Sequence, residues 1–156
     1  METLKVLIAD DSERLLAALR IQLQAQGMAV TTCSDAYMAL DQARKCRPDV
    51  MVLDICMPAG NGFSVLERME KIPEIRGVPV IYITGDRSAA LDIKARRMGA
   101  CGLIHKPISL SALVTLIKRA TGTQIVGPDV DSGNAGAMEF DVSIARDVND
   151  IPGVKQ

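Results

Sequence analysis

Polar side chains of the types used in phosphoryl chemistry lie at the ends of four apolar runs in this sequence. The runs, each with the polar residues that follow, are Leu4–Ala9 with Asp10 and Asp11, Val50–Leu53 with Asp54, Val78–Ile83 with Thr84, and Leu103–His105 with Lys106. If these runs are neighbouring parallel strands, their carboxyl ends share one edge of a sheet and the side chains meet in one pocket. The pattern therefore predicts a site of three carboxylates, one hydroxyl and one ammonium group.

Three carboxylates brought close together repel one another, so each must bind a proton or find a cation. Lys106 supplies one positive charge, which leaves two negative charges for a divalent cation to neutralise. Oxygen ligands favour Mg²⁺ or Mn²⁺. Asp10 or Asp11 could instead cap the helix that follows, although a capping role does not account for the whole set.

Asp54 is the predicted nucleophile of this site, because it stands alone at the end of a central strand. A carboxylate oxygen can attack phosphorus in line. Lys106 and the metal ion would offset the charge of the phosphoryl oxygens, and Thr84 would donate a hydrogen bond to one of them. Gly85 would let the backbone approach the same oxygens closely.

Segments in which apolar residues recur at helical spacing alternate with the apolar runs. They extend from Ser12 to Gly27, from Ser34 or Asp35 to Pro48, from Phe63 to Pro73, from Ser88 to Met98 and from Ser109 to Gly122, and Ala29–Cys33 is a further strand-like run. Five strands alternating with five helices predict an α/β fold: a doubly wound, five-stranded parallel sheet covered by helices on both faces. In the flavodoxin-like strand order 2-1-3-4-5, the ligand crevice lies between strands one and three, beside Asp10, Asp11 and Asp54.

Beyond the last helix, the periodic pattern of apolar residues is lost. Residues 122–156 carry six acidic and two basic side chains among Gly, Ser, Asn and Pro, which favours a flexible acidic tail. We therefore expect one domain over residues 1–121 and a tail over 122–156. The alternative is a short segment that docks on the domain or on a partner through apolar residues such as Met138 and Phe140.

The overall composition argues against several classes of function. The net charge is −1 at pH 7, which does not suit a surface for nucleic acid or anionic lipid. No run of about eighteen apolar residues is present, as a membrane span would need. The four cysteines include no Cys-x-x-Cys pair of the kind found in zinc and redox sites. We expect a soluble cytoplasmic protein that binds neither nucleic acid directly nor a membrane.

Four motifs, in this order and spacing, resemble the receiver (CheY-like) domain of two-component response regulators. They are Asp10-Asp11, the stretch from Asp54 through Pro58 to Gly62, Thr84-Gly85 and Lys106-Pro107. The resemblance covers about residues 3–121. It implies a phosphorylatable signalling switch that catalyses only its own phosphorylation and dephosphorylation, and not an enzyme that turns over a substrate.

By this resemblance, Asp54 would accept a phosphoryl group from a histidine kinase or a histidine phosphotransfer protein. Mg²⁺, or Mn²⁺ in its place, would be held by Asp11, Asp54 and the backbone carbonyl of Cys56. Asp10 would act on the metal ion mainly through water.

The resemblance also implies how the signal leaves the site. Thr84 and Lys106 would contact the phosphoryl group, and the peptide bond between Lys106 and Pro107 would be cis. The face made by the fourth helix, the fifth strand and the fifth helix would then change and bind a downstream protein. Leu103 stands where the family has an aromatic side chain that relays this change. His105, the only histidine, is expected at the surface or an interface of the edge strand.

Other functions fit the sequence less well. A haloacid-dehalogenase-like phosphatase also uses an aspartyl nucleophile, but it needs an acid two residues later, where Cys56 stands. A flavin carrier of the flavodoxin type needs a Ser/Thr/Gly phosphate loop after the first strand, where this chain has acids. The complete set of site residues disfavours a pseudo-receiver that is never phosphorylated. Two alternatives stay open: a phosphorelay shuttle, and the receiver fragment of a longer DNA-binding response regulator.

Overall fold

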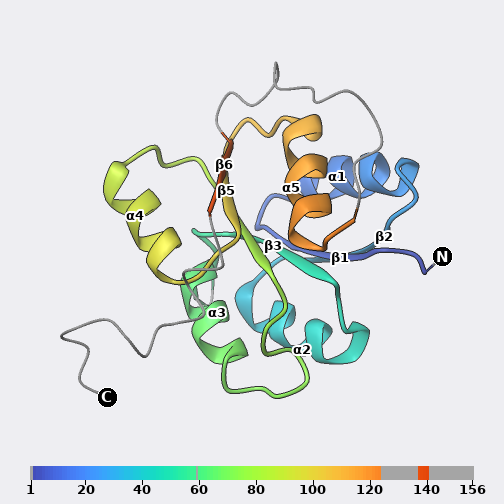
Figure 1. Ribbon diagram of the computed structural model, residues 1–156, viewed down its shortest axis with the longest axis horizontal. Coiled ribbons are helices and arrows are strands. Elements are labelled where there is room, and N and C mark those ends of the chain that lie inside the picture. Colours follow the sequence, from blue (N-terminus) through green and yellow to red (C-terminus); the bar gives the residue numbers. More distant parts are fainter. Residues whose placement is uncertain (1, 59, 124–136, 141–156) are drawn as a thin grey trace.

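A computed structural model describes residues 2–58, 60–123 and 137–140, and one central sheet with helices on both faces organises them (Figure 1). The strands are β1 Lys5–Ala9, β2 Ala29–Cys33, β3 Val50–Asp54, β4 Val80–Thr84, β5 Gly102–His105 and β6 Ala137–Glu139. The helices are α1 Glu13–Ala25, α2 Ala36–Cys46, α3 Gly62–Met69, α4 Ala89–Arg97 and α5 Leu110–Ala120. Within the described residues, none of these helices has the length and apolarity to cross a bilayer.

The strands lie in the order β2-β1-β3-β4-β5-β6, and the pairs up to β5 are parallel. The predicted order 2-1-3-4-5 is thereby confirmed. β6 adds a sixth strand, antiparallel to β5, which we did not predict from the sequence. Successive strands are added to one side of β1 and then to the other, so the carboxyl ends of β1 and β3 border the crevice that this fold offers to ligands.

Helices bury both faces of the sheet, which explains why β1, β3 and β4 are nearly continuous apolar runs. α1 and α5 cover one face through residues such as Leu19 and Leu113. α2 and α3 cover the other face through residues such as Leu40 and Phe63, whereas α4 buries Ala95 alone. The packed sheet gives the ends of its strands fixed positions.

Each of these helices begins at a polar side chain that accepts a hydrogen bond from a backbone N–H three residues later. The capping residues are Ser12, Asp35, Asn61, Ser88 and Ser109. A cap satisfies an N–H group that has no partner inside the helix, and it fixes where the helix begins. α1 therefore starts directly after Ser12, which leaves Asp10 and Asp11 in the turn that follows β1.

The segment 137–140 lies against β5. Phe140, which follows β6, is only 4% exposed, and its N–H donates to the Cys101 carbonyl oxygen at 2.8 Å. For this segment, the structure thus has the docked arrangement that we considered for Met138 and Phe140 as the alternative to a flexible tail. The other residues of the predicted tail beyond Thr123 lie outside the described residues.

β6 also changes the surroundings of His105, because β5 has a neighbouring strand on each side. His105 is 9% exposed, and its Nε2 lies 3.4 Å from Asp92 Oδ1 on α4. The predicted surface or interface position of His105 on an edge strand is therefore wrong. Neither the place of β6 beside β5 nor the contact with Asp92 on α4 was predicted from the sequence.

Candidate functional site

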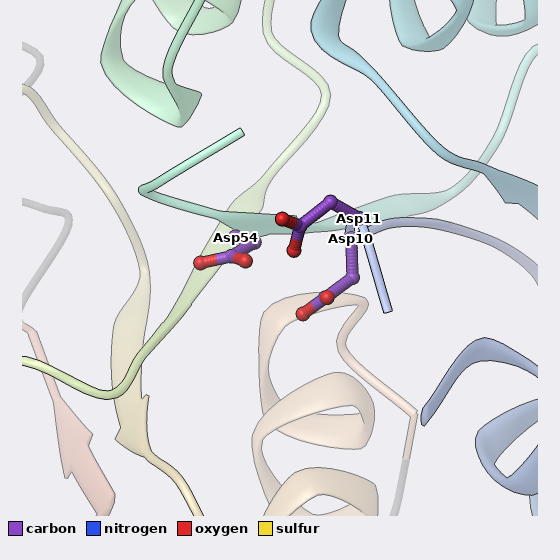
Figure 2. A group of neighbouring side chains, drawn as sticks. All are labelled: Asp10, Asp11 and Asp54. Atoms are coloured by element: carbon purple, nitrogen blue, oxygen red, sulfur yellow. The ribbon is translucent and has the colours of Figure 1, made fainter. Parts of the chain in front are cut away.

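Three carboxylates converge at the carboxyl ends of β1 and β3 (Figure 2). Asp10 and Asp11 follow β1, and Asp54 is the last residue of β3. One carboxylate oxygen from each residue lies within 4.8 Å of the other two. Asp10 and Asp54 are buried, whereas Asp11 is exposed. The fold thus brings together the acids that the sequence placed at this edge, and it leaves one of them open to solvent.

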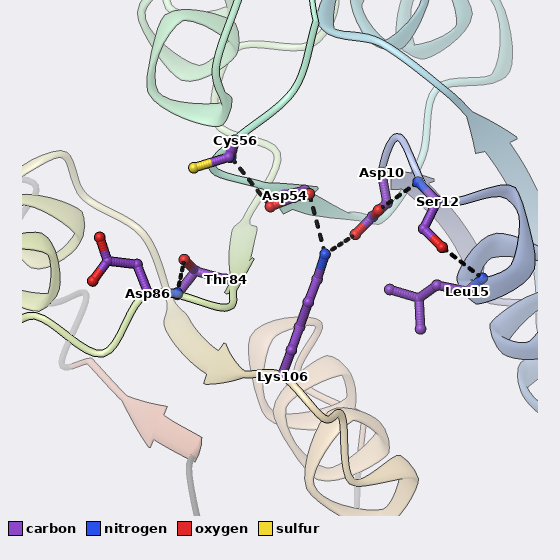
Figure 3. A network of polar contacts seen from close by, with 8 residues as sticks. All are labelled: Asp10, Ser12, Leu15, Asp54, Cys56, Thr84, Asp86 and Lys106. Carbon is purple, nitrogen blue, oxygen red and sulfur yellow. Dashed lines mark hydrogen bonds and ion pairs between the residues drawn. The ribbon is translucent and has the colours of Figure 1, made fainter.

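The Lys106 ammonium lies between the two buried carboxylates (Figure 3). Its Nζ is 2.8 Å from Asp10 Oδ2 and 3.2 Å from Asp54 Oδ2. Lys106 follows β5 directly, and the bond to Pro107 is cis, as the resemblance implied. One cation from β5 therefore offsets part of the charge that β1 and β3 bring together.

Burial and neighbouring charges shift the pKa values of Asp54 and Lys106. Burial raises the pKa of Asp54 and the Asp10 carboxylate raises it further, while the Cys56 N–H and Lys106 oppose the shift without cancelling it. Burial lowers the pKa of Lys106, but its contacts with Asp10 and Asp54 outweigh burial, so the pKa is raised. Lys106 therefore stays protonated, and one further cation near Asp54 would stabilise its ionised form.

Main-chain amides fix the orientation of both buried carboxylates. The Ser12 N–H donates to Asp10 Oδ1 at 2.8 Å, and the Cys56 N–H donates to Asp54 Oδ1 at 3.2 Å. In each case the donor lies two residues after the acid, as in an Asx turn. The Oδ2 atoms of Asp10 and Asp54 are the ones that contact Lys106.

Thr84 ends β4, the strand next to Asp54, and the turn that follows it orients its hydroxyl group (Figure 3). The Asp86 N–H donates to Thr84 Oγ1 at 3.0 Å, and Thr84 is only 1% exposed. The Lys106 N–H donates to the Thr84 carbonyl oxygen at 2.8 Å, which joins the ends of β4 and β5. Because Oγ1 accepts in the bond to Asp86, its own O–H can serve as a donor toward a group at the end of β3.

Two residues that support the site were not predicted from the sequence. The Tyr82 hydroxyl, buried within β4, donates to the Gly62 carbonyl oxygen at 3.3 Å, and burial raises the Tyr82 pKa so that the hydroxyl keeps its proton. A Cβ at Gly62 would lie only 2.8 Å from the Asp54 carbonyl oxygen and 3.0 Å from the Tyr82 ring. The start of α3 is therefore held directly against the end of β3. No regular spacing in the sequence connects Tyr82 with Gly62, so their contact could not be predicted from it.

The donor set of this site suits a hard divalent cation, since it consists of carboxylate oxygens. Asp10 Oδ2 is buried and has an ion pair with Lys106, but it has no aligned hydrogen bond. Asp11 adds an exposed carboxylate. An ion bound there would stay in contact with solvent and could keep part of its hydration shell. The Cys56 side chain is exposed, and its backbone N–H is used by Asp54. The residues present therefore fit Mg²⁺ or Mn²⁺.

Comparisons with known proteins agree with this geometry. The profile of the response regulator receiver domain family matches residues 6–118. Response regulator PleD of Caulobacter vibrioides is 30% identical over 138 residues, which cover 88% of this chain and 30% of PleD. Polar-differentiation response regulator DivK of Brucella anthropi is 31% identical over 117 residues, or 75% of this chain and 95% of DivK.

Other relatives are longer than the part that matches. The probable transcriptional regulatory protein TcrX of Mycobacterium tuberculosis is 31% identical over 94% of this chain and 61% of TcrX. This chain therefore spans less than two thirds of the length of PleD and of TcrX.

Solved structures show the same likeness. Chemotaxis protein CheY4 of Vibrio cholerae has a TM-score of 0.72 at 28% identity, over 76% of this chain and 99% of CheY4. The response regulator domain of Thermotoga maritima CheB has a TM-score of 0.69 at 30% identity, over 80% of this chain and all of that domain, 100%. The fold and the acidic crevice at the carboxyl ends of β1 and β3 (Asp10, Asp11 and Asp54) define a doubly wound signalling domain. The chain belongs to the receiver family of two-component response regulators.

Proposed function

We propose that Asp54 is the residue that accepts a phosphoryl group, and that the chain works as a phosphorylatable switch. The observation that carries this proposal is the setting of Asp54: it is buried, an amide orients it, and one of its oxygens faces the Lys106 ammonium at 3.2 Å. A carboxylate held in this way has a defined orientation and a cation beside it. Asp10 also contacts Lys106, but it precedes Asp11 in a turn and does not end a strand.

In this reaction an Asp54 oxygen attacks phosphorus, and an acyl phosphate bond forms. The bond from phosphorus to the donor breaks, and its electron pair leaves with the donor: a histidine nitrogen of a kinase or phosphotransfer protein, or an acetate oxygen of acetyl phosphate. Lys106 stays protonated and balances charge on the phosphoryl oxygens, while the Thr84 O–H donates to one of them. A bound divalent cation would add further positive charge beside the same oxygens.

For the metal ion, Asp11, Asp54 and the backbone carbonyl of Cys56 are the proposed ligands, with Asp10 acting mainly through water. The close approach of oxygens from Asp10, Asp11 and Asp54 within 4.8 Å supports this assignment. Mg²⁺ commonly takes one or two carboxylates and keeps several waters, which suits a site with one exposed acid. Mn²⁺ can occupy the same oxygen ligands.

The partners proposed are a histidine kinase or histidine phosphotransfer protein as donor, and a downstream protein that binds the face of α4, β5 and α5. We place the chain in the cytoplasm, which suits its four cysteines, all of them unbridged. A phosphorelay shuttle uses the same chemistry. The lengths of PleD and TcrX support a further alternative, in which these residues are the receiver part of a longer regulator.

Acetyl phosphate with Mg²⁺, followed by intact-mass measurement, tests the proposal directly. The unmodified chain is expected to gain the mass of one phosphoryl group, and the gain should be absent with EDTA. Asp54→Asn is expected to abolish the gain, because the amide lacks the nucleophilic oxygen.

A matched control is Asp41→Asn, at an exposed carboxylate that pairs with Lys45 on the surface of α2. This variant should gain the phosphoryl group like the unmodified chain. An unmodified chain that gains no mass, or an Asp54→Asn chain that still gains it, would contradict the assignment.

A further inference from the structure

The side of β5 that faces away from β4, which we call the β5 docking edge (Gly102–His105), is paired with a segment from the C-terminal part of the chain (Figure 1). β6 runs antiparallel to β5 in the register Gly102 with Glu139, Leu103 with Met138 and Ile104 with Ala137. An uncovered strand edge exposes a row of N–H and C=O groups to which another chain can pair. Residues 137–140 therefore cover groups that would otherwise be open to strand pairing.

The β5 docking edge is shaped for close approach of a backbone. A Cβ at Gly102 would lie 2.7 Å from the Met138 carbonyl oxygen and 3.1 Å from Leu116 Cδ1 on α5. The distance to the Met138 oxygen is too short for any Cβ and the distance to Leu116 is tight, so the backbone of β6 occupies the space that any other residue at Gly102 would need. The absence of a side chain at this position is what lets a strand lie here beside α5.

Side chains of the docked segment alternate between the two faces of the sheet, as in a true strand. Ala137 packs with the apolar cluster under α1 and α5, and Met138 packs with the cluster on the opposite face. Phe140 is buried in that second cluster, which also contains Leu103, and the Arg96 guanidinium lies 5.1 Å from its ring centre. The docked segment therefore contacts apolar side chains on both faces of the sheet.

The pairing itself is short. β6 has three residues, whereas strands of about five or six are usual, and a pairing of this length has little stability alone. Residues 124–136 join it covalently to the domain, and such a connection raises the local concentration of the segment at its own edge. The covalent connection therefore adds to what the contacts of residues 137–140 contribute to occupation of the edge.

We propose that the β5 docking edge is a binding site for an extended peptide, and that residues 137–140 are its tethered resident ligand. The ligand class is an antiparallel strand with a small residue, an apolar residue and, two positions later, an aromatic ring. The resident segment keeps the edge closed to strands of other proteins, which can pair with β5 only after displacing it. This inference does not depend on phosphorylation of Asp54.

The test uses the full chain with Phe140→Ala and a synthetic peptide of residues 133–144, followed by amide NMR up to millimolar peptide. Phe140→Ala removes the buried ring and should open the edge. The peptide is expected to bind this variant at least about tenfold more tightly than the unmodified chain, because it no longer competes with an intact tethered segment. The shifted amides should lie in β5 and in the parts of α4 and α5 that face it.

Two controls separate this site from nonspecific binding. Tyr37→Ala removes an aromatic ring that is 71% exposed on α2, and the peptide should bind that variant no better than the unmodified chain. A peptide carrying the Phe140→Ala change should not bind the opened chain. Equal binding to all chains, or no binding to the Phe140→Ala chain at millimolar peptide, would overturn the proposal.

Hydrogen exchange in the unmodified chain gives a second measurement that does not rely on any variant. The Phe140 amide, which donates to Cys101, should exchange through local opening, much faster than amides of β4 such as Tyr82. If both amides exchanged only through global unfolding, the segment would be a permanent part of the sheet, and the proposal of an exchangeable ligand would fail.

Discussion

The acidic crevice and the β5 docking edge are completed in different ways. At the crevice, Lys106 Nζ lies 2.8 Å from the Asp10 carboxylate and 3.2 Å from the Asp54 carboxylate, and the pKa of Asp54 is raised nonetheless. At the docking edge, Gly102 leaves a space that the backbone of β6 fills. Charge therefore dominates the energetics of the crevice, and packing dominates those of the edge. We expect changes of charge to affect the first region and changes of side-chain volume to affect the second.

The contrast also predicts which conditions each region senses. Charge at a partly buried site depends on pH and on divalent cations. Packing of an apolar strand against an edge depends on volume and hardly on either. Mg²⁺ should therefore change the loss of stability caused by variants of the crevice and leave the loss caused by variants of the edge unchanged.

The largest effect is expected for Lys106→Met, which keeps the length of the side chain and removes its charge. Asp10 and Asp54 then face each other without a cation, and we expect a loss of about 2 kcal/mol in the free energy of unfolding in EDTA at neutral pH. Mg²⁺ should restore part of this loss. Urea unfolding measures both values.

The matched control for that variant is Lys45→Met, which breaks a pair with Asp41 in which both side chains are mostly exposed. Its loss should stay below about 0.5 kcal/mol. Equal losses for the two lysines, or no recovery with Mg²⁺, would show that charge does not limit the crevice.

A smaller effect, about 1 to 2 kcal/mol, is expected for Gly102→Ala at the docking edge. The added methyl group meets the Met138 carbonyl oxygen and Leu116, so the segment must move away or the strand must shift. The loss should be the same in EDTA and in Mg²⁺, and hydrogen exchange at Phe140 should become faster. Gly85→Ala, where a Cβ meets nothing within 4 Å, should leave stability nearly unchanged.

The smallest effect is expected for Asp54→Asn in EDTA: a small gain in the free energy of unfolding at neutral pH. Because the pKa of Asp54 is raised by folding, the folded chain binds its proton more readily than the unfolded chain does. The free energy of unfolding therefore falls as pH rises from the ordinary pKa of Asp54 to its raised value.

Urea unfolding across this pH range should show that the advantage of Asp54→Asn over the unmodified chain grows as pH rises, then levels off above the raised pKa. The same comparison for Gly102→Ala should give a constant difference. An Asp54→Asn chain that is less stable than the unmodified chain at neutral pH would mean that the contact with Lys106 outweighs burial and repulsion from Asp10.

The two regions also differ in how far the sequence predicts them. The sequence predicts one shared site for five residues, because parallel strands end at the same edge of a sheet whatever lies between them in the chain. These residues are Asp10, Asp11, Asp54, Thr84 and Lys106. That rule needs only the strands and their order. The parallel part of the fold and the gathering of the acids with Lys106 follow from it.

The docking edge follows from no such rule. β6 has only three residues, which is too few to show an alternating pattern of apolar and polar side chains. Nothing in the sequence distinguishes Gly102 from other glycines at the start of a strand. The contact between Tyr82 and Gly62 was missed for the same reason, since it depends on how α3 packs against the sheet. Contacts that depend on the shape of the assembled fold have no local signature in the chain.

β5 itself is only four residues long, and this shortness has a thermodynamic consequence. Gly102 lies at the beginning of β5 and Lys106 directly after its end. One short strand therefore connects the edge that pairs with β6 to the ammonium group that contacts Asp10 and Asp54. Any coupling between two binding equilibria is equal in both directions. If a ligand at Lys106 lowered the affinity of the edge for a strand tenfold, a bound strand would lower the affinity for that ligand tenfold as well. Equal losses for Gly102→Ala in EDTA and in Mg²⁺, as expected above, would therefore also mean that a ligand bound at the edge leaves the charge state of the crevice unchanged.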